Sequence, residues 1–513
     1  MPDPITSRAP DKPPTIAVLA FENYSNDPDL AYFADGVSEE ILQTVARTTD
    51  LKVIGRASSF QFRGAAKAAK HVAAQLGATH LLDGSVRRSG ARVRITAQLV
   101  DCASGTSVWS DRFDRDLSDV FALQDEIAAA VAAALKAAFT PTPAIIAIDP
   151  KAYDLYLRAR SLAADLDTRA RAELLEQAVA LAPDFAAAWA ALCHARATQA
   201  YFGPWTTTPR AQLRQGAQAA ADKALALNPA AGLAYASLSR LEPLGAYARR
   251  EALLRQAEAA APDDPETLTS VGAFYNHVGF IRQAHGYLAR ACELDPLYPE
   301  AANVLGAILA SLDRVDEVRA HFAACRLTWP NEPIFHIGSL NRAMLTGDWP
   351  TFNALAEVAR AVLGDDPGLR ATLRVGEALR DGDPTFRDRL AARLKSDIQA
   401  TGAAPLHSLL TASAIGMTEA AFAAIEASDY SAVFRTDGQN LAGLYNPGII
   451  FTPTYSRALM ADVRFVSLCA KLGLCRYWAA ADRWPDCATS PTLSYDFKSE
   501  ARRLAQTDAF QQG

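Results

Sequence analysis

Residues 262–296 read PDDPETLTSVGAFYNHVGFIRQAHGYLARACELDP, and this stretch decides the fold of most of the chain. The small residues Gly272 and Ala284 allow two antiparallel helices to approach closely, while the larger Tyr275 and Leu288 fill the space between neighbouring units. Pro296 closes the unit, because a proline soon after a helix end prevents the helix from continuing. The stretch therefore predicts one pair of antiparallel helices.

The same closing signature, Ala (once Cys) three residues after an apolar residue and five residues before a proline, recurs along the chain. The closing prolines are 183, 229, 262, 296 and 330, at intervals of 46, 33, 34 and 34 residues. An interval of 34 is typical of the tetratricopeptide repeat (TPR), and the longer first interval predicts an extended loop at 201–209. We therefore expect an all-α TPR solenoid over 151–365 and an irregular helical C-terminal region over 366–513.

Residues 15–140 carry a different pattern, in which strand and helix signals alternate. Apolar or alternating runs predict strands at 15–21, 51–56, 80–86, 93–100 and 107–115, and helical spacing predicts helices at 30–48, 65–76 and 119–138. The sequence thus predicts an N-terminal α/β domain with a mixed sheet, so the whole chain is an α+β/α multidomain protein. The proline-rich residues 141–150 are the expected linker, and residues 1–14 an expected disordered segment.

Composition limits the compartment and the partners. The chain has 513 residues, about a fifth of them alanine, and a formal net charge of −6, so it offers no bulk attraction to nucleic acid or to an anionic membrane. Its seven cysteines form no C-x-x-C pair, as expected of free thiols in a reducing compartment. The N-terminus has no signal-peptide pattern and no apolar stretch approaches the roughly 20 residues of a membrane span. These features predict a cytoplasmic protein without membrane insertion.

The first domain resembles the TolB-like domain of bacterial signalling fusions. The resemblance is carried by IAVLAFEN (16–23), YFADGVSEEI (32–41), VIGRASSFQFRG (53–64) and similar segments at 81–105 and 108–128. In that family the module stands between an effector, either a class III nucleotide cyclase or a winged-helix DNA-binding domain, and a C-terminal TPR array. The tail at 468–487 also looks like the end of those fusions. No effector precedes Thr15, so the chain resembles the non-catalytic C-terminal portion of such a fusion.

We find no nucleotide-binding, catalytic or metal-binding motif, and expect no catalytic residue, no cofactor and no metal. Cys469, Cys475 and Cys487 are spaced poorly for zinc and are expected to be free thiols. His277 and His285 on neighbouring predicted helices are interpreted as packing or surface residues rather than ligands.

Three groups of polar residues in the first domain have competing interpretations. Arg56, Ser58 and Ser59 follow a predicted strand and form either a ligand crevice or a capped turn. Asp35 and Glu39 are expected on a solvated helix face rather than in acid–base catalysis. Arginines clustered at one hairpin are expected to pair with aspartates on neighbouring strands rather than to bind an anion; the residues are Arg87, Arg88, Arg92, Arg94, Asp83, Asp101, Asp111 and Asp114.

In a TPR array the concave surface is lined by the first helix of each unit. Repeat positions place six candidate partner-binding residues near that surface: Arg240, Glu266, Thr269, Asn276, Glu300 and Asn303. The positions that a basic clamp for a C-terminal carboxylate would need are mostly alanine, so that mode is disfavoured.

The leading hypothesis is a non-catalytic protein–protein interaction scaffold or regulatory adaptor in bacterial signalling. The alternative is a sensory partner of a separately encoded nucleotide cyclase or DNA-binding transcription regulator. An enzyme with a site at the Arg56–Ser59 crevice is the third possibility. The sequence leaves the oligomeric state open.

Overall fold

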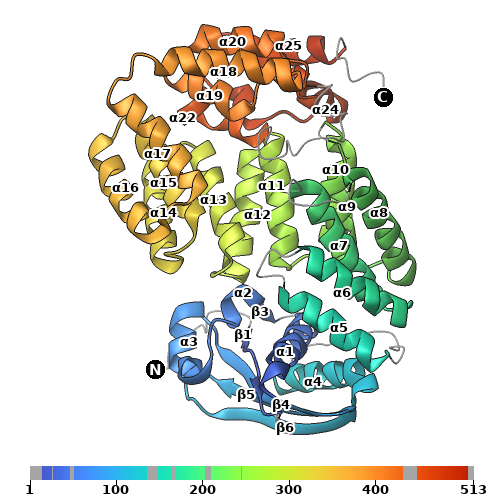
Figure 1. Ribbon diagram of the computed structural model, residues 1–513. Coiled ribbons are helices and arrows are strands. Elements are labelled where there is room, and N and C mark those ends of the chain that lie inside the picture. The colour runs from blue at the N-terminus through green and yellow to red at the C-terminus, as the bar shows by residue number, and fades with distance from the viewer. Residues whose placement is uncertain are drawn as a thin grey trace, which may run out of the picture.

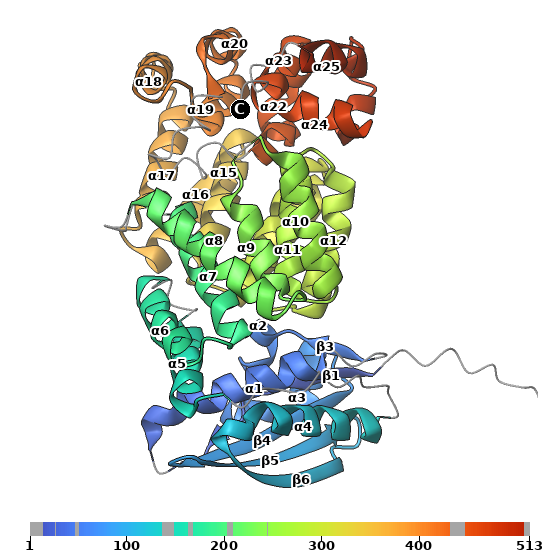
Figure 2. The same ribbon diagram turned by 90° about the vertical axis from the view of Figure 1, so that its right-hand side faces the viewer.

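The computed structural model describes residues 14–25, 27–46, 51–135, 148–162, 168–202, 209–243, 245–430 and 447–506. The expected disordered segment 1–14 lies outside these ranges apart from Pro14, as do residues 141–147 of the expected linker and most of the predicted 201–209 loop. A sheet module forms one end of the molecule, and an array of helices rises from it and curves over it (Figures 1 and 2).

The N-terminal sheet is mixed, as the sequence predicts. Its strands are β1 (Thr15–Val18), β2 (Glu22–Asn23), β3 (Lys52–Ile54), β4 (His80–Ser89), β5 (Arg92–Asp101) and β6 (Ser107–Asp116), and the main order is β3-β1-β4-β5-β6. β1 pairs in parallel with β3 and β4, whereas β4, β5 and β6 form an antiparallel meander. The two edge strands on this path are therefore β3 and β6, and β6 is much the longer.

Helices cover the two faces of the sheet unequally. Helices α1 (Ala31–Val45) and α4 (Val120–Ala134) bury one face in a large apolar core, and α3 (Ala69–Leu76) covers part of the other. Gly77 ends α3 with a φ of 66°, in the left-handed conformation that glycine adopts most easily, so it is the expected C-cap. Residues Arg56–Ser59, expected as strand end and turn, form a one-turn helix, α2.

The array consists of antiparallel helix pairs. Its first helices are α5 (Pro150–Ser161), α6 (Thr168–Leu181), α7 (Ala186–Phe202), α8 (Arg210–Leu227), α9 (Gly232–Leu241) and α10 (Tyr247–Ala260). The next are α11 (Pro265–His277), α12 (Ile281–Leu294), α13 (Pro299–Ser311), α14 (Val315–Thr328), α15 (Pro333–Leu345) and α16 (Trp349–Leu363). Each of the five closing prolines lies two residues after a helix end, and α11, α13 and α15 start 34 residues apart. The predicted period is confirmed.

The close approach of α11 and α12 has the predicted cause. A Cβ added to Gly272 would lie 1.8 Å from Leu288 Cδ2, so only glycine leaves room for the fully buried leucine. In the next unit a Cβ at Gly306 would lie 2.8 Å from the Phe322 ring. Small residues on the first helix therefore set the spacing of each pair.

Helices continue beyond residue 365 as α17 (Pro367–Arg380), α18 (Phe386–Thr401), α19 (Leu406–Ala414), α20 (Thr418–Ala427), α22 (Pro453–Met460), α23 (Arg464–Lys471), α24 (Leu474–Ala481) and α25 (Phe497–Ala505). The C-terminal segment returns to the middle of the array, near α10 and α11 (Figure 1). The buried Trp478 donates from Nε1 to the carbonyl oxygen of Val278 at 2.8 Å, and Glu251 accepts hydrogen bonds from Tyr477 and Arg483 at 2.9 and 2.8 Å. The tail is thus an integral part of the array core.

Candidate interaction site at the junction of sheet and array

The sheet module and the array meet at α2, where an aspartate from the array caps the short helix. Asp295, which follows α12 and is 4% exposed, accepts hydrogen bonds from the backbone N–H groups of Ala57 and Ser58 at 3.0 and 2.7 Å. The Ser58 hydroxyl also donates to Asp295 and accepts from the Leu297 N–H at 2.6 Å. Burial raises the pKa of Asp295, while its hydrogen bonds from Ser58 oppose the rise. The Asp295 carboxylate therefore lies where the sequence analysis expects either a bound ligand or a capped turn.

A Cβ on Gly55 would lie 2.3 Å from Asp295 Oδ2, and the Gly55 N–H donates to the Leu294 carbonyl oxygen at 2.7 Å. Glycine at this position thus permits the contact between module and array. The ligand hypothesis for Arg56, Ser58 and Ser59 stays a prediction that requires Asp295 to move, because Ser58 and Ser59 are fully buried here.

A second contact joins α1 to α5 through buried charges. Arg160 binds Glu39 and also donates to Glu40 Oε1 at 3.0 Å and to the Tyr156 hydroxyl at 2.7 Å. Arg56 Nε lies 3.0 Å from the second carboxylate oxygen of Glu39. The expectation that Glu39 faces solvent is wrong, because α5 covers this face of α1 and supplies Arg160 as its partner.

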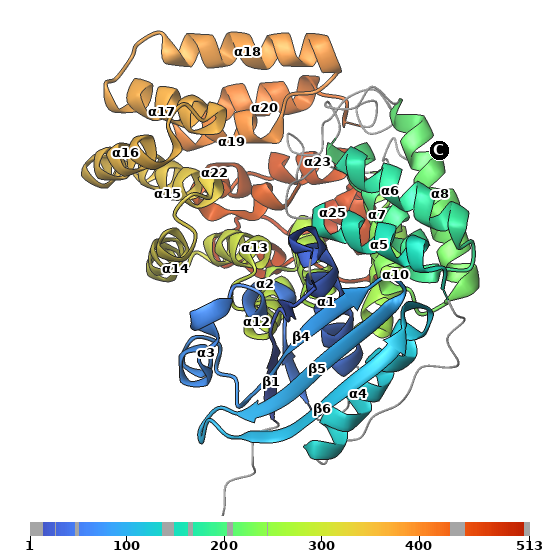
Figure 3. The ribbon, with the colours of Figure 1, turned by 60° about the horizontal axis from the view of Figure 1, so that its bottom comes forward.

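Further ionisable groups near this contact come from several array helices and interact electrostatically with one another. With Glu39 and Arg160 they form a set that we call the junction cluster: Glu39, Arg160, Arg171, His194, Arg240, Glu266, Tyr298 and Glu300. In Figure 3, α1 lies between α5 to α7 on one side and α12 to α14 on the other, so the sheet module closes one end of the concave side. Six array helices or their flanking residues contribute to the cluster.

Glu266 lies at the acidic side of the junction cluster. Glu266 is an exposed residue, yet loss of hydration beside the surrounding helices, reinforced by the negative charges of Asp264, Glu39 and Glu300, raises its pKa to about 7. Tyr298 donates to Glu300 Oε2 at 3.0 Å. Near neutral pH this side can therefore take up or release a proton.

The opposite side of the cluster is basic. Burial lowers the pKa of His194 well below its usual value, and the positive charges of Arg240 and Arg171 act in the same direction. His194 Nδ1 lies 3.3 Å from the Ser237 hydroxyl. The Nε of Arg171 is buried without a hydrogen-bond partner among the described residues. The cluster therefore has arginines on one side, one of them with a nitrogen that lacks a partner among the described residues, and acidic groups on the other.

The structure brings together three of the six predicted partner-binding residues, Arg240, Glu266 and Glu300. Thr269 is buried and donates to the Pro265 carbonyl oxygen at 2.7 Å, and Asn276 is buried near the other end of α11. Asn303 is half-buried on α13. A role of these six in binding stays a prediction. Sequence reasoning missed Arg171 because it lies on α6, the second helix of its pair, and missed Arg160 because its partners come from α1 of the sheet module.

The hairpin arginines form several kinds of pair. Arg94 binds Asp114 across strands β5 and β6 at 3.0 Å, as predicted. Arg88 instead binds Asp154 of α5 at 2.6 Å, and Arg87 donates to the Tyr24 carbonyl oxygen. Asp35 pairs with Arg63 at 2.6 Å. Three of these charges thus join neighbouring elements of the module, and the fourth fixes it to the array.

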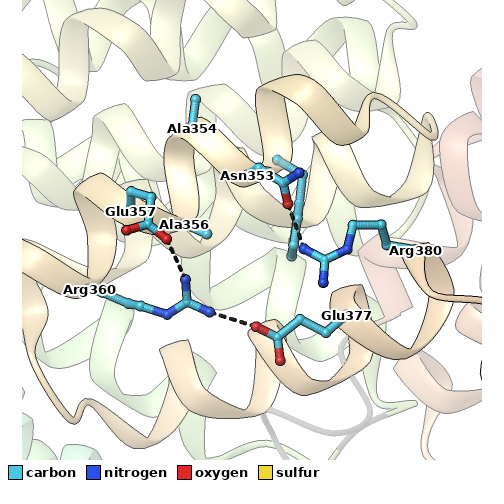
Figure 4. A pocket seen from close by; sticks show the side chains of 8 residues that line it. Asn353, Ala354, Ala356, Glu357, Arg360, Glu377 and Arg380 are labelled. Atoms are coloured by element: carbon cyan, nitrogen blue, oxygen red, sulfur yellow. Dashed lines mark hydrogen bonds and ion pairs between the residues drawn. The ribbon is translucent and has the colours of Figure 1, made fainter.

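A shallow hollow of about 330 Å³ lies between α16 and α17 (Figure 4). Its charged lining is already paired: Arg360 binds Glu357 and Glu377 at 2.9 and 2.6 Å, and Arg380 donates to the side-chain oxygen of Asn353 at 2.7 Å. None of the described residues that line this hollow has a buried polar atom without a hydrogen-bond partner, as Arg171 has in the junction cluster. The hollow is therefore the weaker candidate for a binding site.

The part of the chain that the structure describes contains no group of three or more His, Cys, Asp or Glu side chains placed to hold a metal ion. All seven cysteines are free thiols. His277 is half-buried, whereas His285 lies 3.5 Å from an Arg314 nitrogen. Within the described ranges, no helix is long and apolar enough to cross a membrane.

Comparison with known proteins gives one curated relative and several solved structures. No protein-family model matches the chain. The chain is 38% identical over 187 residues to Putative adenylate cyclase 3 of Rhizobium meliloti (strain 1021). This match covers 35% of the chain and 32% of the relative, so the chain spans about a third of that protein's length.

Among solved structures, the chain is similar to YrrB, described as a TPR protein with an unusual peptide-binding site, with 19% identity, a TM-score of 0.29, and coverage of 40% of this chain and 99% of that one. It is also similar to PilW, a type IV pilus biogenesis factor, with 16% identity, a TM-score of 0.35, and coverage of 44% and 99%. Yeast Tom70 gives 12% identity, a TM-score of 0.27, and coverage of 71% and 89%.

Proposed function

We propose that the protein is a non-catalytic interaction scaffold or regulatory adaptor, whose concave side holds a segment of a protein partner against the junction cluster. The observation that carries this proposal is that Arg171 Nε is buried without a hydrogen-bond partner among the described residues, in a cluster that also holds Arg240 and Glu266. A buried guanidinium nitrogen without a partner costs free energy unless a bound group satisfies it. A partner segment with a carboxylate for the arginines and an amide or cation for Glu266 fits this arrangement.

Selection of a displayed random-peptide library on the intact protein tests this proposal. We expect enrichment of segments that carry an acidic residue, and loss of their binding in Arg171→Ala/Arg240→Ala. Arg169→Ala is the matched control, because Arg169 lies on the same helix with a side chain 77% exposed. Failure to enrich any sequence, or equal binding by the double variant, contradicts the proposal.

The second candidate function is that of a sensory or regulatory partner of a separately encoded nucleotide cyclase or DNA-binding transcription regulator. The similarity to a putative adenylate cyclase over 187 residues favours it, together with the TolB-like motifs of the N-terminal module. Cyclic-nucleotide levels in cells with and without this gene test the cyclase branch, and expression profiles test the regulator branch. Unchanged levels and unchanged profiles would exclude this second candidate.

A cytoplasmic location belongs to the same proposal and is supported by the seven free thiols. Cell fractionation with antibody detection tests it, and recovery from an oxidising compartment would contradict it.

A further inference from the structure

The charges and the backbone hydrogen-bonding groups along the free edge of the sheet are self-complementary. β6 is an outer strand, and β5 is its strand partner among the described residues (Figures 1 and 3). The opposite edge, β3, has three residues, whereas β6 has ten. β6 is therefore the long edge on which another strand could pair.

The direction of the β6 backbone groups follows from two hydrogen bonds. The N–H of Leu117 donates to the carbonyl oxygen of Ala91 at 2.7 Å, so odd-numbered residues near this end of β6 face β5. Even-numbered residues then point their N–H and C=O groups outward. Consistent with this, the Arg112 N–H binds the side chain of Asp111 at 2.7 Å instead of β5.

Side chains from the strand itself cap two of the outward groups. Asp111 accepts from the Arg112 N–H, and Arg115 Nη1 donates to the carbonyl oxygen of Asp114 at 3.0 Å. Both caps come from exposed or half-buried side chains that another strand could displace. These two outward groups are thus satisfied in a single chain by local contacts.

We propose that β6 pairs antiparallel with β6 of a second copy of this chain, about a twofold axis at Phe113. Two copies related by such an axis pair symmetrically about one residue, so the register is fixed by the choice of that residue. Centring on Asp111, Arg112, Asp114 or Arg115 would place like charges opposite each other, which is destabilising. Centring on Phe113 instead places Arg112 opposite Asp114 and Asp111 opposite Arg115.

The same register also gives hydrogen-bond partners to the outward N–H and C=O groups of Arg112 and Asp114. Arg112 and Asp114 of the two copies become a hydrogen-bonded pair, so the outward N–H and C=O groups bond to each other. Asp111 and Arg115 are released from capping and face each other across the axis. Pairing therefore exchanges local caps for ladder bonds and places four pairs of opposite charges across the two strands, in addition to the ion pairs of Asp114 with Arg94 and of Arg115 with Glu126 within each chain. This surface is separate from the junction cluster, and the inference is independent of the proposed partner.

Sedimentation velocity of the intact protein over a concentration series tests the proposal. We expect a dimer in the wild type and a dissociation constant raised at least about tenfold in Asp111→Lys and in Arg115→Glu, because each places like charges opposite each other. Asp316→Lys, at an α14 side chain that is 94% exposed, makes the same charge change elsewhere and should leave the dimer intact.

Mixing provides the decisive comparison. When Asp111→Lys and Arg115→Glu chains are combined, the lysine faces the new glutamate and Arg115 faces Asp111, so a mixed dimer should form from two monomeric variants. Hydrogen exchange at the Arg112 and Asp114 amides should slow on dimer formation. A monomeric wild type, or variants that stay dimeric, or a mixture that stays monomeric although both chains give wild-type circular dichroism, would overturn the proposal.

Discussion

At the scale of single residues, Asp295 shows how one carboxylate can join two parts of a chain. It lies more than 230 residues from the amides of Ala57 and Ser58 that it caps. We expect Asp295→Ala to lower the free energy of unfolding by about 1–3 kcal/mol, because the buried N–H groups of α2 and the Ser58 hydroxyl lose their acceptor. Urea denaturation measures this change.

The matched control is Glu293→Ala, two residues away. The Glu293 side chain is 73% exposed and lies 3.8 Å from Lys52, so its loss should change the free energy of unfolding by less than about 0.5 kcal/mol. Equal effects of the two substitutions would mean that Asp295 does not anchor α2.

Glu266 gives a pH-dependent expectation. Its pKa is raised from 4.5 to about 7 in the folded protein, so folding disfavours the ionised carboxylate. The associated stabilisation is present below about pH 4.5 and is lost as the pH rises through about 7. Relative to Glu266→Gln, the wild type should therefore become less stable between pH 5 and pH 8. Thermal unfolding at a series of pH values measures the difference.

A second variant checks the cause of this shift. Glu300→Gln removes one of the negative charges that raise the pKa of Glu266, so it should move the titration toward lower pH. Parallel stability curves for the wild type and Glu266→Gln would show that Glu266 does not titrate in this range.

At the scale of elements, α11 and α12 depend on Gly272. We expect Gly272→Ala to lower the free energy of unfolding by about 1–3 kcal/mol, because its Cβ would overlap the buried Leu288 side chain. Urea denaturation followed by circular dichroism measures this loss.

Gly286, in the middle of α12, is the control for backbone effects. A Cβ at Gly286 meets nothing within 4 Å, so Gly286→Ala should stabilise the protein by up to about 1 kcal/mol through helix propensity. A stabilising Gly272→Ala would contradict the packing explanation.

Local signals in the sequence predicted the elements well. The closing prolines mark the ends of α6, α8, α10, α12 and α14, because a proline ends a helix through its own ring. The alternation at Val93 and Ile95 predicted the half-buried β5, whose other face is exposed. Helix ends and the alternation of buried and exposed residues in a strand depend on residues that are close in the chain, so they can be predicted from a single sequence.

The candidate site could be predicted only in part. Repeat positions identified Arg240, Glu266 and Glu300, since each lies on the first helix of a pair. Asp295, Arg160 and Arg171 were missed, because their roles arise from the docking of array against module. Glu39 has the sequence signature of a surface residue, and only the arrival of α5 buries it.

At the scale of the whole molecule, the predicted boundary at 141–150 does not separate two apolar cores. One cluster of buried residues extends from the sheet and α1 through α5 and as far as α9. A Cβ at Gly36 of α1 would lie 2.6 Å from Leu157 of α5, which shows how closely the two helices pack. The array therefore begins as part of the sheet module's core, and a partner bound on the concave side would also contact the module.

This continuity predicts the outcome of cutting the chain. A protease site placed at residues 141–145, once cleaved, should leave fragments that elute together in size-exclusion chromatography, because the apolar core, the Arg160 network and the Asp295 cap still join them. Arg160→Ala/Asp295→Ala should promote separation after cleavage, since it leaves Glu39 and Glu40 buried without Arg160. Arg169→Ala, on the exposed side of α6, should have no effect. Fragments of the cleaved wild type that separate without denaturant would show that the module and the array are independent units, and a signal could then pass between them only through the chain connecting them.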